Sequence, residues 1–140
     1  MSTEIKTTWK SWKPISDDFR LSELTAIDYP LKEKAGIVFD VIEEGKIKRT
    51  LQIKFSTFIT FRIADESHRY TNLQEFSHDQ LLSGSLFYSD KSEYIDWITS
   101  QSSLVMENWS LKHYIIATTD TEWIDIITKD EPEVAWLTNN

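Results

Sequence analysis

The stretch IKRTLQIKFSTFITFRI, residues 47–63, decides the predicted fold. From residue 51 to residue 63 the odd positions are apolar apart from Thr57, and the even positions are polar apart from Phe58. A period of two in residues rich in Ile, Phe and Thr predicts a strand with one core face and one polar face. The apolar parity is the same on both sides of the break, so a one-residue bulge is not expected there. We therefore predict one long strand over residues 51–63, with Arg62 on its polar face and Ile63 as its last core residue.

A second β-rich run, AGIVFDVIEE at residues 35–44, precedes this strand. Gly45 lies between the two runs in a short polar loop, where a residue that tolerates positive φ is typical of a hairpin. The sequence predicts that residues 36–43 pair with the long strand through the loop Glu43–Lys46. Ile53 and Phe55 are predicted to lie in the core.

The middle of the chain predicts the helical part of the fold. Thr71 and Ser77 each stand three residues before a glutamine, which predicts short helical turns around residues 72–83. The strand SLFY follows, and then one main helix over about 90–102, with Asp90 as the N-cap residue. The apolar face of this helix is expected to hold Tyr94, Trp97 and Ile98.

The last part of the chain predicts a second hairpin, between LKHYIIAT at residues 111–118 and EWIDIIT at residues 122–128. Val134, Trp136 and Leu137 are expected to anchor the tail, and residues 1–24 are expected to form an irregular segment. Together these elements predict an α+β fold: a single domain over 1–140 with a mostly antiparallel sheet and one main helix packed on it.

Composition excludes several classes of protein. The chain has no cysteine, so it has no disulfide, no thiolate nucleophile and no sulfur-ligated zinc site. Its net charge of −8 argues against binding to nucleic acid, which needs a surplus of Lys and Arg. The polar N-terminus and the absence of a long apolar run argue against a signal peptide and a membrane span. We expect a soluble protein of the cytoplasm.

The charges are distributed unevenly. Residues 46–54 carry four basic groups and no acid, whereas residues 111–140 carry six acids against two lysines. Such a segment is either an ordinary solvated rim or a face that binds a basic protein. On the second interpretation the partner-binding candidates are Asp120, Glu122, Trp123, Asp130, Glu131 and Glu133.

Motifs that would support catalysis or cofactor binding are absent from the sequence. His68 and His78 have carboxylates nearby but no ligand spacing of a known metal site, so we predict neither a metal nor a cofactor. His113 and Asp125 interrupt apolar strands. A hydrogen-bonded histidine within a sheet face and a partnered carboxylate are the structural interpretations, and a catalytic base is the alternative.

Three stretches resemble small bacterial immunity proteins, which neutralise a cognate toxin domain: FSTFITFRIADES, SEYIDWITSQS and LKHYIIATTDTEWIDIITKDEPEV. The resemblance lies in size, acidity, aromatic content and the lack of cysteine and catalytic motifs. It implies a non-enzymatic inhibitor that binds a basic toxin domain, such as a nuclease, through an acidic surface. The alternative is a small enzyme or ligand-binding domain with a pocket between the sheet and residues 66–84, lined by His68, Tyr70 and His78.

Overall fold

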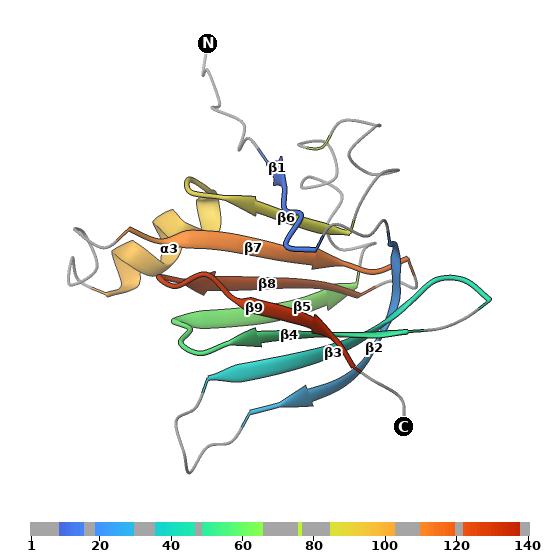
Figure 1. Cartoon of the computed structure of the whole chain (residues 1–140). Coiled ribbons are helices and arrows are strands. Elements are labelled where there is room, and N and C mark those ends of the chain that lie inside the picture. Colours follow the sequence, from blue (N-terminus) through green and yellow to red (C-terminus); the bar gives the residue numbers. More distant parts are fainter. Residues whose placement is uncertain are drawn as a thin grey trace.

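The computed structural model describes residues 9–15, 19–29, 36–46, 49–65, 76, 85–102, 110–119 and 122–137. Within these residues the chain forms nine strands and one helix, as Figure 1 shows. The strands are β1 (Lys10–Ser11), β2 (Leu21–Asp28), β3 (Ile37–Glu43), β4 (Thr50–Phe55), β5 (Thr60–Asp65), β6 (Leu86–Ser89), β7 (Lys112–Ala117), β8 (Glu122–Thr128) and β9 (Glu133–Trp136), and the helix is α3 (Glu93–Gln101). The described structure is thus broadly α+β, with far more strand than helix.

The strands form two antiparallel sheets. One sheet has the order β1-β6-β7-β8-β5, and the other has the order β2-β3-β4-β9. The two predicted hairpins are confirmed, because β3 pairs with β4 and β7 pairs with β8. Gly45, in the first hairpin loop, has φ +143°, in the range predicted for it.

The prediction of one long strand over residues 51–63 is wrong. Residues 50–55 form β4 in the four-stranded sheet, and residues 60–65 form β5, which pairs with β8 in the other sheet. Thr57 and Phe58 lie where the chain crosses between the sheets, and the hydroxyl of Thr128 donates to the Thr57 carbonyl oxygen at 2.8 Å. The shared apolar parity does not mean one shared core face, because Phe61 packs in the cluster between the two sheets whereas Ile59 packs in a second cluster with Tyr94 and Ile127.

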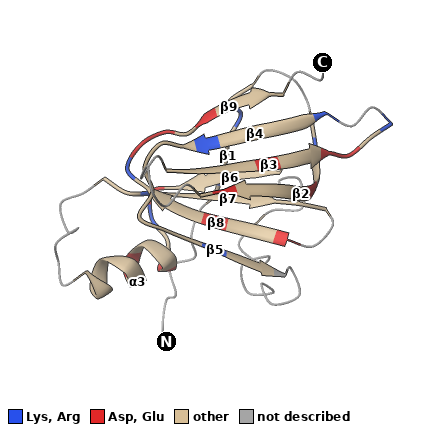
Figure 2. Cartoon of the chain, turned by 90° about the horizontal axis from the view of Figure 1, so that it is seen from below, with Lys and Arg blue, Asp and Glu red and all other residues tan. Residues whose placement is uncertain are grey.

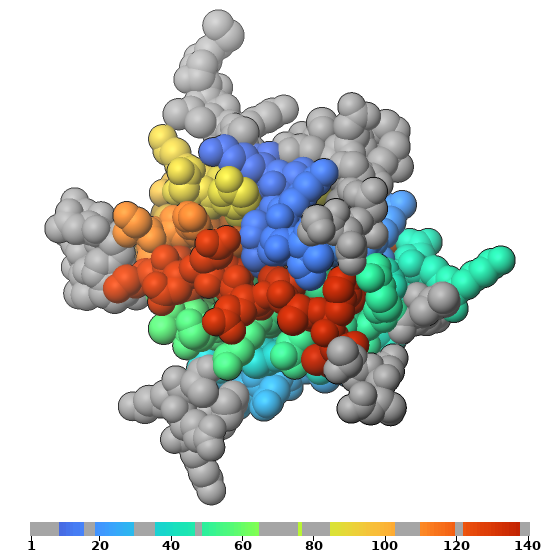
Figure 3. All heavy atoms as spheres, in the orientation of Figure 1, coloured from blue at the N-terminus to red at the C-terminus, as the bar shows by residue number. Residues whose placement is uncertain are grey.

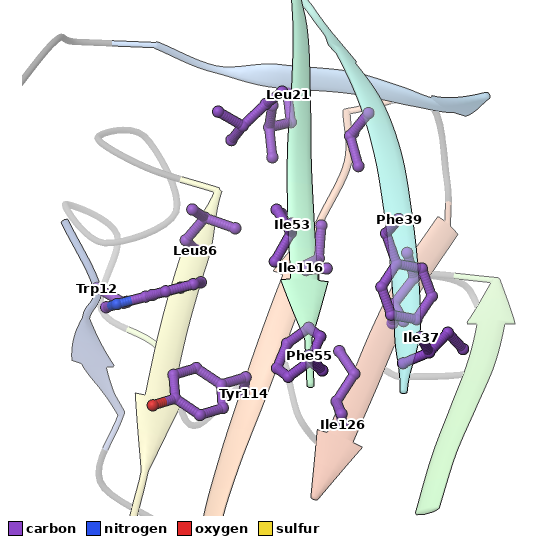
Figure 4. Close-up of a cluster of buried hydrophobic side chains, with 13 residues drawn as sticks. Trp12, Leu21, Ile37, Phe39, Ile53, Phe55, Leu86, Tyr114, Ile116 and Ile126 are labelled. Atoms are coloured by element: carbon purple, nitrogen blue, oxygen red, sulfur yellow. The ribbon is translucent and has the colours of Figure 1, made fainter. Parts of the chain in front are cut away.

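The main core fills the space between the two sheets (Figure 4). Phe39, Ile53 and Phe55 reach it from the four-stranded sheet, and Tyr114 and Ile126 reach it from the other. Phe55 and Tyr114 make an edge contact, with ring centroids 5.7 Å apart. Ile53 and Phe55 are both buried, which confirms their predicted place in the core. Ile63 is 41% exposed, so its prediction as a core residue is wrong.

The outer face of the five-stranded sheet is also covered. Tyr94 and Ile95 of α3 pack there with Leu111 and Ile127, and Trp9 and Phe76 pack over Trp123 and its neighbours. Phe76 is the one described residue within the predicted helical turns at 72–83, and the rest of that prediction lies outside the described residues.

Two further predictions are corrected. Residues 1–24 are not wholly irregular: β1 pairs with β6, β2 begins at Leu21, and Trp9 and Trp12 are buried. The helix is capped by Ser92 rather than Asp90, since the Ser92 hydroxyl accepts from the Ile95 amide. Ile95 is buried, whereas Trp97, which was expected on the apolar face, is 52% exposed.

The predicted tail contacts are partly present. Val134 and Trp136 lie on β9, which pairs with β4, and both pack against the main core. Leu137 is exposed. The described part of the chain contains no helix with the length and apolar character that crossing a membrane requires.

Candidate functional site

The structure separates the predicted partner-binding residues into two groups. Glu122 begins β8, whereas Asp130 and Glu131 follow its end, and Glu133 begins β9. Because a strand rises about 3.3 Å per residue, the two ends of β8 lie roughly 20 Å apart. Asp120 lies outside the described residues.

Trp123 does not belong to an exposed face. It points to the covered outer side of the five-stranded sheet, where Phe76 meets it edge-on at 5.5 Å, and it is only 3% exposed. Glu122 is half-buried, and its carboxylate accepts from the Thr118 hydroxyl at 3.2 Å. These two residues therefore add little to any acidic surface.

Asp130, Glu131 and Glu133 are exposed and lie within four residues of one another, a segment called here the acidic turn, residues 130–133. The Thr57 hydroxyl donates to the Asp130 carboxylate at 2.6 Å, and the Asp130 amide donates to the Thr128 hydroxyl at 3.2 Å. These bonds fix the start of the acidic turn on the end of β8. Figure 3 shows the C-terminal segment, in red, running across the front of the molecule.

Basic residues lie close to the acidic turn (Figure 2). Glu133 stands opposite Lys54 where β9 pairs with β4, so part of the basic stretch predicted at residues 46–54 lies beside the acidic tail. Arg49, in the same stretch, is bound to Glu43 and stacks on the Trp136 ring at 3.8 Å. Asp130 and Glu131 lie between β8 and β9, outside the strand pairing.

Glu131 also affects the pKa of a buried phenol, that of Tyr114. Burial, with added repulsion from the Glu131 carboxylate and Tyr88, raises the pKa of Tyr114 to about 12. The Tyr88 ring has the ammonium groups of Lys10 and Lys112 each 5.8 Å from its centre. Charges of both signs therefore lie near the Tyr88 and Tyr114 side chains.

A buried polar network lies on the other side of the five-stranded sheet, under α3. His113 Nε2 is 2.6 Å from Asp125 Oδ1, and His113 Nδ1 is 2.8 Å from the Ser92 hydroxyl. Arg62 Nε donates to Asp125 Oδ2 at 3.0 Å. Asp125 is 0% exposed, and the rings of Trp9 and Tyr94 contact His113 edge-on.

The sheet register explains why these residues meet. Asp125 pairs with Arg62 of β5, and His113 pairs with Ile127 of β8, two residues beyond Asp125 on the same face. Ser92 reaches the same point because it caps α3, which packs on this face. The prediction of a hydrogen-bonded histidine within a sheet face is confirmed, and Asp125 is indeed partnered. Ser92 was not predicted as part of this network, because its role depends on where α3 begins.

The contacts run from Ser92 to His113 to Asp125. Catalytic serine sites have the same series of contacts, from a serine nucleophile to its base to the group that orients the base. A neutral imidazole satisfies every contact here, with Nε2–H donating to Asp125 and Nδ1 accepting from the Ser92 hydroxyl. The serine is buried, however, and its oxygen accepts the Ile95 amide at 3.1 Å as a helix cap. These contacts hold Ser92 inside the fold and join α3 to the sheet.

The pocket expected between the sheet and residues 66–84 cannot be placed, since His68, Tyr70 and His78 lie outside the described residues. Among the residues with described positions, no group of three His, Asp or Glu side chains has an arrangement that could hold a metal ion. Comparisons with protein-family models, with curated proteins and with solved structures found no match to this chain.

Proposed function

We propose that this protein is a non-enzymatic binding domain that binds a basic protein partner through the acidic turn. The observation that supports the proposal most is the exposure of Asp130, Glu131 and Glu133 on a segment held in place by Thr57 and Thr128. The resemblance to immunity proteins makes a cognate toxin domain, such as a nuclease, the first partner to test.

The acidic turn is suited to steering association. Carboxylates on a fixed segment require less ordering when a partner binds. The net charge of −8 adds a long-range field of the same sign. In physiological salt this field acts over about 8 Å, and it chiefly raises the association rate.

The test begins with purification of the full-length chain from its host and isolation of any stoichiometric basic partner. Association rates are then measured by stopped flow at low and high salt. The variant Asp130→Asn, Glu131→Gln, Glu133→Gln should associate about tenfold more slowly than wild type at low salt, and the difference should shrink at high salt. Asn at 130 keeps an acceptor for Thr57.

The matched control removes the same charge elsewhere, by Asp28→Asn, Asp90→Asn and Asp96→Asn, all at exposed positions. An equal loss of rate in both triple variants would show that only the total charge matters and that the acidic turn is not the binding surface. A wild-type rate for the acidic-turn variant at low salt would contradict the proposal.

The proposal that the protein is not an enzyme is tested separately. A fluorophosphonate probe labels activated serines, and we expect no labelling of Ser92 in the native protein. Labelling that is lost in His113→Gln would show that the network activates Ser92, and it would replace the binding proposal with a hydrolase.

A further inference from the structure

Among the strands that the structure describes, four lie at sheet edges, and three of these have features that discourage pairing with another chain. β1 has two residues, β9 has four, and the pairing of β2 with β3 contains two register shifts. Short edges and bulges are common means by which proteins block edge-to-edge association. β5 has neither feature, because its six residues pair with β8 in one unbroken register.

One edge of β5 is open within the described structure. Among the strands that the structure describes, β5 pairs with β8 alone. In an antiparallel ladder the backbone groups of alternate residues point away from the neighbouring strand. Figure 2 shows β5 as the outermost strand of its sheet, so these groups face away from the sheet.

Exposed apolar side chains lie on both sides of this edge. The described residues include five large exposed apolar side chains: Ile27, Tyr29, Ile63, Trp97 and Leu137. On the core side, Ile63 belongs to β5 itself, and the Tyr29 ring lies 6.5 Å from the Phe61 ring, centroid to centroid. Ile27 is paired with Phe39, and the Phe39 ring also contacts Phe61. On the helix side, Trp97 stacks on Tyr94, with ring centroids 5.9 Å apart. Leu137 alone lies elsewhere, beyond β9.

Arg62 supplies a directed charge at the middle of this edge. Its Nε donates to the buried Asp125, and its guanidinium lies 4.1 Å from the centre of the Tyr94 ring. The side chain is still 43% exposed, and within the described residues its other nitrogens donate to no side chain. A guanidinium held in this way offers two parallel donors to a carboxylate.

From these features we infer that β5 binds an extended segment of another protein by strand addition. The segment carries an acidic residue opposite Arg62 and apolar residues on either side of it. Side chains alternate along a strand, so the acid meets Arg62 while the flanking apolar residues meet Ile63 and Phe61 on the other face. This inference does not depend on the acidic turn.

A second copy of the chain is a poorer occupant than a different protein. Symmetric antiparallel pairing of two β5 strands places both Arg62 side chains on the same face, opposite or diagonal to each other. Like charges at such positions are destabilising. The occupant is therefore a foreign segment with an apolar–acidic–apolar pattern.

The test uses the full-length, isotope-labelled chain and the capped peptide Thr-Val-Glu-Val-Thr, followed by amide NMR shifts. We expect shifts at residues 60–65 and at the indole N–H of Trp97, and slower amide exchange at residues 60–65. The matching peptide with Lys in place of Glu should bind about tenfold more weakly. Because the chain has net charge −8, general attraction would favour the lysine peptide, so a preference for Glu identifies Arg62 as the contact.

Two controls complete the test. A glutamate peptide that is N-methylated at the alternate amides facing β5 should lose binding, because these amides are the donors that pair with the strand. Ile63→Lys should also lose binding, while Leu137→Lys, at the exposed apolar position away from β5, should bind as wild type does. No shifts at millimolar peptide, equal binding of the two peptides, or shifts that avoid residues 60–65 would overturn the inference. A concentration-dependent dimer abolished by Ile63→Lys would overturn it in favour of self-pairing.

Discussion

Asp125 is completely buried, and its two carboxylate oxygens accept from His113 and from Arg62. Asp125→Ala would leave the buried Nε2–H of His113 without its acceptor, which typically costs about 1–3 kcal/mol. We therefore expect this variant to lower the free energy of unfolding by about that amount, measured by denaturant titration. Asp40 is the control: it interrupts β3 in the same way but is half-buried and accepts from Gln52 at 3.3 Å, so Asp40→Ala should cost less than about 1 kcal/mol. Equal losses would show that the network under α3 has no special role.

Tyr114 gives the structure a defined response to alkaline pH. Its pKa is raised to about 12, above the ordinary value of 10, first because it is buried and then because Glu131 and Tyr88 lie near it. Below the ordinary pKa both folded and unfolded chains keep the phenol proton. As pH rises further, the unfolded chain loses this proton first, so stability falls. The fall between about pH 10 and pH 12 should be smaller in Tyr114→Phe than in wild type, as measured by urea titration at each pH. Identical pH profiles would contradict the buried environment of this phenol.

Ser92 decides the geometry of α3 at the scale of the element. Its hydroxyl caps the helix and also contacts His113, so Ser92→Ala should lower stability by about 1–2 kcal/mol. Asp90, the N-cap residue that the sequence predicts, is exposed, and Asp90→Ala should change stability by less than about 0.5 kcal/mol. Thermal unfolding of the two variants distinguishes the two helix starts. A larger loss from Asp90→Ala would restore the predicted cap.

The elements also show where sequence patterns are sufficient. Both hairpins follow from alternation and turn residues, since these are local signals. The break at Thr57 and Phe58 was visible, but whether a strand pauses or crosses to another sheet depends on tertiary pairing, which alternation does not encode. The strand β2 was not predicted, because its pairing with β3 is irregular and its second half is exposed. The need for glycine at position 36, where φ is +84°, also depends on tertiary contacts, because a Cβ there would collide with the Phe55 carbonyl oxygen.

At the scale of the whole molecule, the candidate site also has features that the sequence predicts and features that depend on tertiary contacts. The acids of the turn follow from composition, and the structure confirms that Asp130, Glu131 and Glu133 are exposed. The sequence could not show that Trp123 faces the covered side of its sheet or that Lys54 stands opposite Glu133, since both depend on which strands are neighbours. Nor could the sequence show that Ser92, His113 and Asp125 are in contact, since they lie on three separate elements.

At this scale the acidic turn and the open edge of β5 consist of different residues, 130–133 and 60–65, so one footprint distinguishes them. The most direct measurement is amide hydrogen exchange of the full-length chain, free and saturated with its purified basic partner. Binding through the acidic turn predicts slower exchange at residues 129–133 of the complex, and predicts that this protection is lost together with affinity in the variant Asp130→Asn, Glu131→Gln, Glu133→Gln. Protection confined to other segments, such as the basic stretch at residues 49–54, with residues 129–133 unchanged, would contradict the proposed binding surface.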